Sequence, residues 1–263
     1  MEKVAVVGMG LIGGSFYKAS LRAGYETAAL HHGDPGDFAG VGIVVVCLPY
    51  DAVAPWVTAR AGRFEPGTIV VDAAGVKRPV MEALRGVPKG WHFVGGHPMA
   101  GREVSGYANS SADLFRGASM VLTPPEGTPD AVLARLRGFL RALGFGGSVV
   151  TSPENHDATI AFTSQLGHVA ATAYARDPAM RGCGAYAGGS FADMTRIATQ
   201  DAAAWASLYL ANRDFLLATL DGFQGRLAEF RAALASGDAA TLQRLIQEGD
   251  AAKRREMAGV AAS

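Results

Sequence analysis

Two stretches in the first hundred residues combine residue types that could act on a small molecule. One is the glycine run Gly8-Met9-Gly10-Leu11-Ile12-Gly13, which directly follows a short apolar stretch. The other, VGGHPMAGRE at residues 94–103, flanks His97 with small residues that leave room for a substrate. Because a neutral imidazole can accept a proton near pH 7, the two features together predict proton transfer beside a bound nucleotide.

The glycine run has the physical features of a pyrophosphate site. Gly8 permits a tight turn, Gly10 lets the backbone approach the phosphates, and Gly13 lets the following helix pack closely on the sheet. Free amides at the start of that helix, and its dipole, favour negative charge. A glycine-rich turn without a ligand is the alternative. The expected cofactor-binding residues in this run and at neighbouring strand ends are Gly8, Gly10, Leu11, Ile12, Gly13, Leu48, Pro49 and Gly75.

The residue that usually selects NAD is missing from its expected place. An acid commonly ends the second strand and binds the ribose 2′-hydroxyl. Here His31 and His32 hold that place, and Asp34 follows close behind. Two imidazoles would tolerate a 2′-phosphate, so we expect NAD or NADP with a slight preference for NADP. Asp34 could restore NAD binding, and a solvated turn at both histidines is the alternative.

Further polar residues lie where a substrate could meet the cofactor. The segment 72–77, DAAGVK, falls at the carboxyl end of the fourth predicted strand, where open α/β sheets bind ligands. In the second half, Ser164 and His168 are four residues apart and so share a helix face, with Gln165 between them. The run GGSFADMTR, which ends at Arg196, follows them along the chain. His92 and His156 are expected to be structural.

The elements that must position these residues change character near residue 150. Before it, β-branched runs alternate with amphipathic stretches, which predicts an α/β fold with a doubly wound, mostly parallel sheet. The strands are expected at 4–7, 27–30, 43–48, 68–71, 92–94, 120–122 and 148–150. Helices are expected between them at 11–23, 52–61, 79–84 and 129–143.

After residue 150 the sequence pattern predicts helix for nearly every segment. Ser152-Pro153-Glu154 is a good helix start, with a capping serine, a proline and an acid. The longest helix is expected to run unbroken from Asp201 to Gly237 along one apolar stripe. That stripe exceeds what a small domain buries, so it predicts a homodimer through the helical region. We therefore expect a dinucleotide-binding Rossmann domain at 1–150 and an all-helical substrate-binding and dimerisation domain at 151–263.

Bulk composition excludes several other classes of protein. The 24 basic and 24 acidic side chains cancel, which leaves no broad electrostatic footprint for nucleic acid or an anionic membrane. No stretch approaches the length of a membrane helix. Cys47 and Cys183 stand far apart, as in a reducing compartment, so the cytoplasm is the expected location. No Cys/His cluster has metal-ligand spacing, and no metal is expected.

Taken together, these motifs resemble the prephenate dehydrogenase family, the prephenate and arogenate dehydrogenases of tyrosine biosynthesis. The resemblance rests on the glycine run with Ser15, the Gly-Gly-His-Pro-Met-Ala-Gly run, the Ser-Gln-Leu-Gly-His segment and Gly-Ser-Phe-Ala-Asp-Met-Thr-Arg, and it covers essentially the whole chain. It implies a Rossmann domain, a helical dimerisation domain and NAD(P)-linked oxidative decarboxylation, giving 4-hydroxyphenylpyruvate or tyrosine.

Within that resemblance, each polar residue receives a hypothetical role. His97 would bind the ring 4-hydroxyl and take its proton as hydride leaves C4. Arg196 would hold a substrate carboxylate with its planar guanidinium, while Ser164 and His168 would hydrogen-bond the far end of the substrate. Lys77 lies near the cofactor end, where it would order the loop.

The chain also departs from the family pattern. Gly75 stands where many relatives have a serine that helps orient the catalytic histidine, and Gln165 stands where many have a second histidine. Glu103 could pair with the ammonium group of arogenate, whereas Arg102 would favour the keto acid prephenate, so the choice of substrate stays open. Gln165, Arg102 and Glu103 complete the set of expected substrate-binding residues.

Two other functions are compatible with the sequence. A β-hydroxyacid dehydrogenase or imine reductase also combines a Rossmann domain with helices, but places a lysine or another polar group on the long helix, and none is placed that way here. A catalytically idle homologue that senses dinucleotide or an aromatic precursor would explain Gly75 and the missing acid. Turnover with prephenate or arogenate distinguishes these possibilities.

Overall fold

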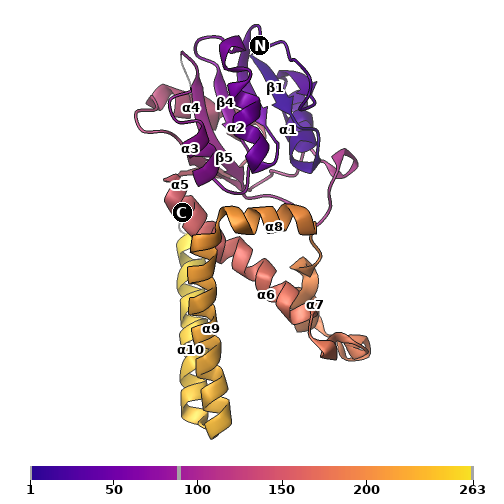
Figure 1. Ribbon diagram of the computed structural model, residues 1–263, viewed down its shortest axis with the longest axis vertical. Helices are drawn as coiled ribbons and strands as arrows, with labels where there is room; N and C mark the ends of the chain where they lie inside the picture. The colour runs from indigo at the N-terminus through magenta and orange to yellow at the C-terminus, as the bar shows by residue number, and fades with distance from the viewer. Residues whose placement is uncertain (1, 88–89, 262–263) are drawn as a thin grey trace. The chain divides into compact units, whose positions relative to one another are not determined.

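The computed structural model describes residues 2–87 and 90–261, which form two compact units that divide between Arg213 and Asp214. The first unit is built on a seven-stranded sheet in the order β2-β1-β3-β4-β5-β6-β7 (Figure 1). All neighbouring strands are parallel except β5 and β6, which are antiparallel. The strands are β1 (Lys3–Val7), β2 (Glu26–Leu30), β3 (Val41–Val46), β4 (Ile69–Asp72), β5 (His92–Pro98), β6 (Ser119–Thr123) and β7 (Gly147–Val150).

All seven predicted strands are present because each is a β-branched or apolar run between glycine-rich turns. The central strands β1, β3 and β4 are buried along nearly their whole length, as expected of strands covered on both faces. The ten residues between Leu30 and Val41 contain no helix, so the connection from β2 to β3 is as short as the sequence predicts. The expected α/β fold is confirmed.

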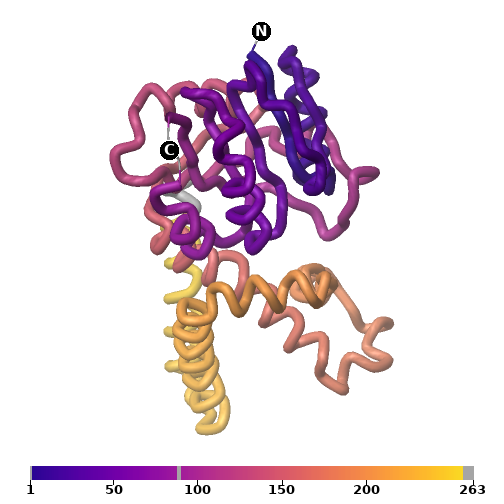
Figure 2. The backbone as a smooth tube through the Cα atoms, turned by 45° about the horizontal axis from the view of Figure 1, so that its top comes forward, coloured from indigo at the N-terminus to yellow at the C-terminus, as the bar shows by residue number. Residues whose placement is uncertain are grey.

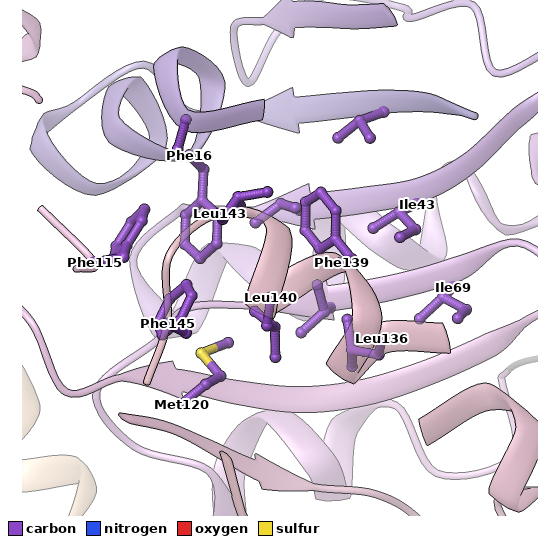
Figure 3. Packing of buried hydrophobic residues seen from close by; sticks show 14 of the residues in the cluster. Phe16, Ile43, Ile69, Phe115, Met120, Leu136, Phe139, Leu140, Leu143 and Phe145 are labelled. Carbon is purple, nitrogen blue, oxygen red and sulfur yellow. The ribbon is translucent and has the colours of Figure 1, made fainter. Parts of the chain in front are cut away.

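Helices cover both faces of this sheet and enclose two apolar clusters. Figure 3 shows one cluster, in which Phe16, Phe115 and Phe145 pack together. The Phe115 and Phe145 rings stack at a centroid distance of 4.7 Å. The helices of this part are α1 (Leu11–Arg22), α2 (Tyr50–Thr58), α3 (Arg78–Ala83) and α4 (Asp130–Ala142), with short 3-10 turns at Ala61–Arg63 and Tyr107–Asn109.

A helical stretch follows β7 within the same unit. It comprises α5 (Pro153–Ile160), a π-helical turn at Ala161–Gln165, α6 (Leu166–Ala175), α7 (Gly189–Thr195) and α8 (Ala202–Ala211), with 3-10 turns at Pro178–Met180, Cys183–Tyr186 and Arg196–Ala198. As predicted, the Ser152 hydroxyl caps α5 by accepting a hydrogen bond from the Asn155 amide at 3.1 Å. Figures 1 and 2 both show α8 lying across the α/β part at one end of the strands. There Ser207 donates to the Tyr50 hydroxyl at 3.2 Å.

The prediction of one unbroken helix from Asp201 to Gly237 is wrong. The helix stops at Ala211 and a new one starts at Arg213, because Asn212 leaves helical geometry with φ −120° and ψ 26°. The Asn212 amide is fully buried and donates to the Asp157 carbonyl at 2.8 Å and to Gln165 Oε1 at 2.9 Å. These tertiary hydrogen bonds break the helix at Asn212 even though the apolar pattern continues beyond it.

The second compact unit consists of two long helices, the part of α9 (Arg213–Ser236) beyond its first residue and α10 (Ala239–Ala261). They run antiparallel and side by side, joined at Gly237, whose φ of +68° suits glycine (Figures 1 and 2). Leu217, Leu227 and Leu234 on α9 are each more than half exposed. None of the helices in the described residues is long and apolar enough to cross a membrane.

Candidate active site

The glycine turn after β1 has the tight geometry that its sequence predicts. Gly8 has a φ of +86°, and a side chain there would collide with the Cys47 carbonyl. A side chain at Gly13 would collide with the Gly8 carbonyl, whereas the space beside Gly10 is open. Helix α1 then begins at Leu11 without a side-chain cap or an acid in its first turn. Its amides are therefore suited to an incoming phosphate.

The sheet order brings the candidate site residues together at the carboxyl ends of the parallel strands. The carboxyl ends of the parallel strands β1, β3 and β4 lie together, and they lead to the glycine turn, to Leu48-Pro49 and to Gly75. Next in order is β5, which carries His97 near its own carboxyl end. Three strand spacings of about 4.8 Å separate β1 from β5, or about 14 Å in all. A ligand that starts at Gly8 and crosses β3 and β4 would therefore end beside His97.

His97 is held by a buried chain of hydrogen bonds. Its Nδ1 lies 3.0 Å from Nε2 of His156, and His156 Nδ1 lies 2.7 Å from Oδ1 of Asp157. Both His156 and Asp157 come from the start of α5 and are at most 2% exposed. The expectation that His156 is purely structural is therefore incomplete, because His156 contacts the candidate base directly.

This chain of contacts fixes which ring nitrogen of His97 can act as a base. Asp157 also accepts from the backbone amides of Lys77 and Arg78, at 2.7 and 2.9 Å. Burial alone would raise the Asp157 pKa, but the hydrogen bonds from His156 and these amides lower it below its usual value. The carboxylate therefore accepts the His156 Nδ1 proton, and His156 Nε2 accepts the Nδ1 proton of His97. The lone pair of His97 is left on Nε2.

The electrostatic setting keeps His97 neutral. Burial holds its pKa well below the ordinary value of 6.5, and the neighbouring His156 and Lys77 lower it further. Neutral imidazole is the form that can accept a proton from a substrate hydroxyl. His97 therefore has the protonation state of a general base at neutral pH.

Lys77 connects the strand ends around His97. Its ammonium group is fully buried and bonds both to the Asp72 carboxylate and to the carbonyl of Gly96, the residue before His97. Asp72 accepts in turn from the Gly96 amide at 2.9 Å. Burial lowers the Lys77 pKa, and the nearby Asp72 opposes that shift. Lys77 thus orders the loop, as its sequence position suggested, by joining the ends of β4 and β5.

A pocket of about 320 Å³ opens beside His97. Its size suits a small ligand. The predicted site residues that line it are Gly75, His97, Arg102, Glu103, Ser164, Gln165 and His168. They come from strand ends, from the loop after β5, and from the π-helical turn and α6. Gly75 and His168, which are 93 positions apart in sequence, thus meet at one cavity.

Arg196 is not among the residues that line the pocket, but its guanidinium forms an ion pair with Glu103, which does line it. Both side chains are well exposed. Inside the pocket, His168 Nδ1 lies 3.0 Å from the Ile197 carbonyl, and its ring centroid is 3.8 Å from that of Trp205. The part of the pocket lined by Glu103 and His168 is therefore polar and charged.

Comparison with known proteins agrees with this geometry. The nucleotide-binding domain model of prephenate dehydrogenase matches residues 20–150, and the dimerization domain model of the same enzyme matches residues 152–248. A cyclohexadienyl dehydrogenase from Zymomonas mobilis is 30% identical over 96% of this chain and 95% of that relative. The chain belongs to the prephenate dehydrogenase family.

Solved structures give the same assignment at the level of fold. A prephenate dehydrogenase from Aquifex aeolicus, in complex with hydroxyphenyl propionate and NAD+, is 25% identical, with a TM-score of 0.80 over 98% of each chain. An arogenate dehydrogenase from Synechocystis is 24% identical, with a TM-score of 0.82 over 97% of this chain and 99% of that one. A 3-hydroxyisobutyrate dehydrogenase from Salmonella typhimurium, at 15% identity and a TM-score of 0.56, shares the fold alone.

Two of the residues expected to bind ligand in this prephenate dehydrogenase family member lie in the pocket wall. Gly75 leaves ordinary room for a side chain, since a Cβ there would lie 3.5 Å from Leu208 and 4.0 Å from Cε1 of His97. Gln165 is 2% exposed, and its amide accepts from Asn212 and donates to the Leu208 carbonyl at 3.3 Å. The Gln165 amide therefore helps to shape the wall, and its role as a substrate ligand stays a prediction.

The histidines at the end of β2 lie apart from the pocket. His31 and His32 are exposed, and the His31 amide donates to the Asp34 carboxylate at 2.7 Å. Arg60 donates to the Asp34 carbonyl at 2.7 Å and lies over the Trp56 ring at 4.6 Å. Asp34 thus turns its carboxylate back toward the strand end.

Sequence reasoning missed His156 and Asp157 as partners of His97. The signal available was a histidine followed directly by an acid in the first turns of a capped helix. Nothing in the spacing of 59 residues between His97 and His156 shows that their rings touch. In the described residues, no group of three or more His, Cys, Asp or Glu side chains could hold a metal ion.

Proposed function

We propose that this protein catalyses oxidative decarboxylation of prephenate or arogenate with a nicotinamide dinucleotide, using His97 as the base. The observation that carries the proposal is the Asp157–His156–His97 chain, which leaves the lone pair of His97 on Nε2, together with the pocket of about 320 Å³ that His97 lines. Membership of the prephenate dehydrogenase family supports the same reaction. The products are 4-hydroxyphenylpyruvate from prephenate and tyrosine from arogenate.

The dinucleotide would lie across the carboxyl ends of β1, β3 and β4. Gly10 offers open backbone for the pyrophosphate, and the amides at the start of α1 face it. Leu48, Pro49 and Gly75 would line the path toward His97. When bound, the nicotinamide supplies the hydride acceptor for C4 of the substrate.

The residues of the pocket would act on the substrate as follows. His97 Nε2 accepts the proton of the C4 hydroxyl while C4 loses hydride, which converts that carbon to a ketone. The C1–carboxylate bond then breaks, its electron pair enters the ring, and carbon dioxide leaves. The phenolate oxygen that results takes back the proton from His97. Electrons and protons balance with one dinucleotide reduced for each carbon dioxide released.

Substrate would be oriented by the polar end of the pocket. Arg196 has the planar donor geometry to hold a carboxylate, which would replace or share its present partner Glu103. Ser164 and His168 face the same cavity from one side, and Arg102 and Glu103 from another. Gln165 shapes the wall between them.

For the cofactor, we propose a preference for NAD. The imidazoles of His31 and His32 by themselves favour NADP slightly. However, the Asp34 carboxylate is held at the end of β2 by the His31 amide, where it would attract a ribose hydroxyl and repel a 2′-phosphate. The ratio of kcat/KM for NAD to that for NADP should exceed one and fall in Asp34→Asn, with Asp37→Asn as the matched surface control.

We also propose that residues 1–150 and 151–263 act as dinucleotide-binding and helical domains, and that the chain forms a homodimer through its helices. The two family models meet between residues 150 and 152, and the second is described as a dimerization domain. Exposed leucines on α9 supply an apolar surface. Sedimentation of the whole chain tests this, since a monomer at micromolar concentration contradicts it.

The central test is a steady-state assay of the purified protein with prephenate or arogenate and each dinucleotide. We expect reduced cofactor and carbon dioxide to appear in equal amounts, with 4-hydroxyphenylpyruvate or tyrosine as product. An idle homologue would bind dinucleotide without turning over either substrate, and that result would contradict the proposal.

A further inference from the structure

The side chain of His168 is held rigidly at the polar end of the pocket. One edge of its ring contacts the Ile197 carbonyl through Nδ1 at 3.0 Å, and one face lies against Trp205. The segment around Ile197 is fixed in turn by Gln200, whose amide donates to Thr172 at 2.6 Å and to the His168 carbonyl at 3.4 Å. The ring therefore has little freedom to turn over.

These contacts determine the tautomer of His168. A backbone carbonyl can only accept hydrogen bonds, so the proton must be on Nδ1. Burial lowers the pKa of His168, with the hydrogen bond to Ile197 and the charge of Glu103 opposing that shift and Arg196 adding to it. The ring is therefore neutral at pH 7. Its Nε2, on the edge away from Ile197, is an acceptor and cannot donate.

An acceptor at this place suits only one of the two possible substrates. The side chain of prephenate ends in a ketone and a carboxylate, which are both acceptors and would face the Nε2 lone pair unfavourably. The side chain of arogenate carries an ammonium group, which donates. Glu103 lines the same cavity and adds a negative charge that favours the ammonium group, while Arg102, which also lines it, offers a guanidinium to the carboxylate. Arg196 lies beside them as the ion-pair partner of Glu103.

We infer that this enzyme selects the amino-acid substrate arogenate over the keto acid prephenate, and that His168 is the residue that distinguishes the two side chains. The inference rests on the proposed function, because it concerns the side chain of the same substrate. His97 treats the two substrates alike, since their rings are identical. Discrimination therefore falls to the end of the pocket where His168 lies.

The experiment compares kcat/KM for arogenate and prephenate, at pH 7.5 and saturating NAD, in the native enzyme and in His168→Gln. A glutamine amide can turn its NH₂ group toward a ketone or carboxylate. We expect a native ratio of at least ten in favour of arogenate, because hydrogen bonds to charged groups are the strong ones. The ratio should fall at least fivefold in the variant, mainly through KM. His92→Gln, at the far end of β5, is the matched control and should keep the native ratio.

Binding of the products provides a second measurement that does not depend on turnover. Calorimetry with NADH present should show tighter binding of tyrosine than of 4-hydroxyphenylpyruvate in the native protein. A native kcat/KM ratio below ten, or tighter binding of the keto acid, overturns the inference and leaves the proposed function intact. An unchanged ratio in His168→Gln overturns the role of His168. Absence of turnover with both substrates overturns the proposed function, while calorimetry still decides the inference.

Discussion

The two ends of the pocket are built in opposite ways. At the reactive end, His97 rests on groups that are almost fully buried, and each carboxylate there accepts several hydrogen bonds. At the recognition end, Arg196 and Glu103 form an exposed ion pair that salt and substrate can break. Buried contacts therefore hold the reactive histidine in one position, whereas the exposed side chains that would bind the substrate can rearrange.

The largest expected effect comes from removing the base itself. His97→Asn should lower kcat/KM by about 10²- to 10⁴-fold, the usual contribution of a positioned general base. Binding of the reduced dinucleotide should change little, because the glycine turn lies three strand spacings away from His97. Stopped-flow measurement of hydride transfer checks the loss of activity, and fluorescence titration of the reduced cofactor checks that binding is retained. Turnover that survives unchanged would show that another group takes the proton.

A second prediction concerns the buried pair beneath the reactive end. Lys77→Met leaves the Asp72 charge buried without its partner, so it should lower the free energy of unfolding by about 3–5 kcal/mol. The double variant Lys77→Met with Asp72→Asn should recover part of that loss. Denaturant unfolding of each variant measures the effect.

The surface pair of Lys3 and Glu26 provides the control for that measurement. Both side chains are largely exposed, at 45% and 65%. Lys3→Met should therefore change the free energy of unfolding by less than about 1 kcal/mol. Equal losses of unfolding free energy in Lys3→Met and Lys77→Met would contradict the claim that burial makes the Lys77 pair more important to stability.

A third prediction tests the relay to Asp157. His156→Ala removes the acceptor for the His97 Nδ1 proton, so kcat should fall by about 10²-fold as the base loses its fixed tautomer. His156→Gln should restore part of the loss, because its amide oxygen can accept the same proton. A merely structural role would give no such rescue, and steady-state kinetics of both variants decides the point.

The smallest expected effect is at Gly75. Serine fits there without strain, since a Cβ would make only ordinary contacts with Leu208 and His97. Its hydroxyl could add one hydrogen bond to the His97 ring, worth at most about tenfold in kcat. Gly75→Ala, which adds the same Cβ without the hydroxyl, is the control, and equal kcat in both variants would rule out that hydrogen bond.

Much of this fold could be predicted from the sequence because its signals are local. Runs such as Ile43-Val44-Val45-Val46 indicate buried strands by themselves, and Gly8 and Gly13 mark a turn whose crowding the structure confirms. The His97 motif likewise stands within ten residues of sequence.

The remaining features depend on contacts between distant residues. The break at Asn212 arises from hydrogen bonds to Asp157 and Gln165, neither of which is close in sequence. The ion pair of Arg196 with Glu103 spans 93 residues. No periodicity or motif encodes such pairings, so they became visible only once the fold placed the segments together.

The most direct test of the account is the pH dependence of kcat/KM in the native enzyme and in His156→Ala. Because burial and the neighbouring groups hold the pKa of His97 well below 6.5, the neutral base should persist and activity should fall only at pH values clearly below 6.5. Alanine at position 156 leaves space for water beside the His97 ring, which relieves the burial that lowers its pKa, so that decline should move to higher pH. A native decline centred at or above pH 6.5, or the same profile in both proteins, would contradict a buried, carboxylate-anchored His97 as the base.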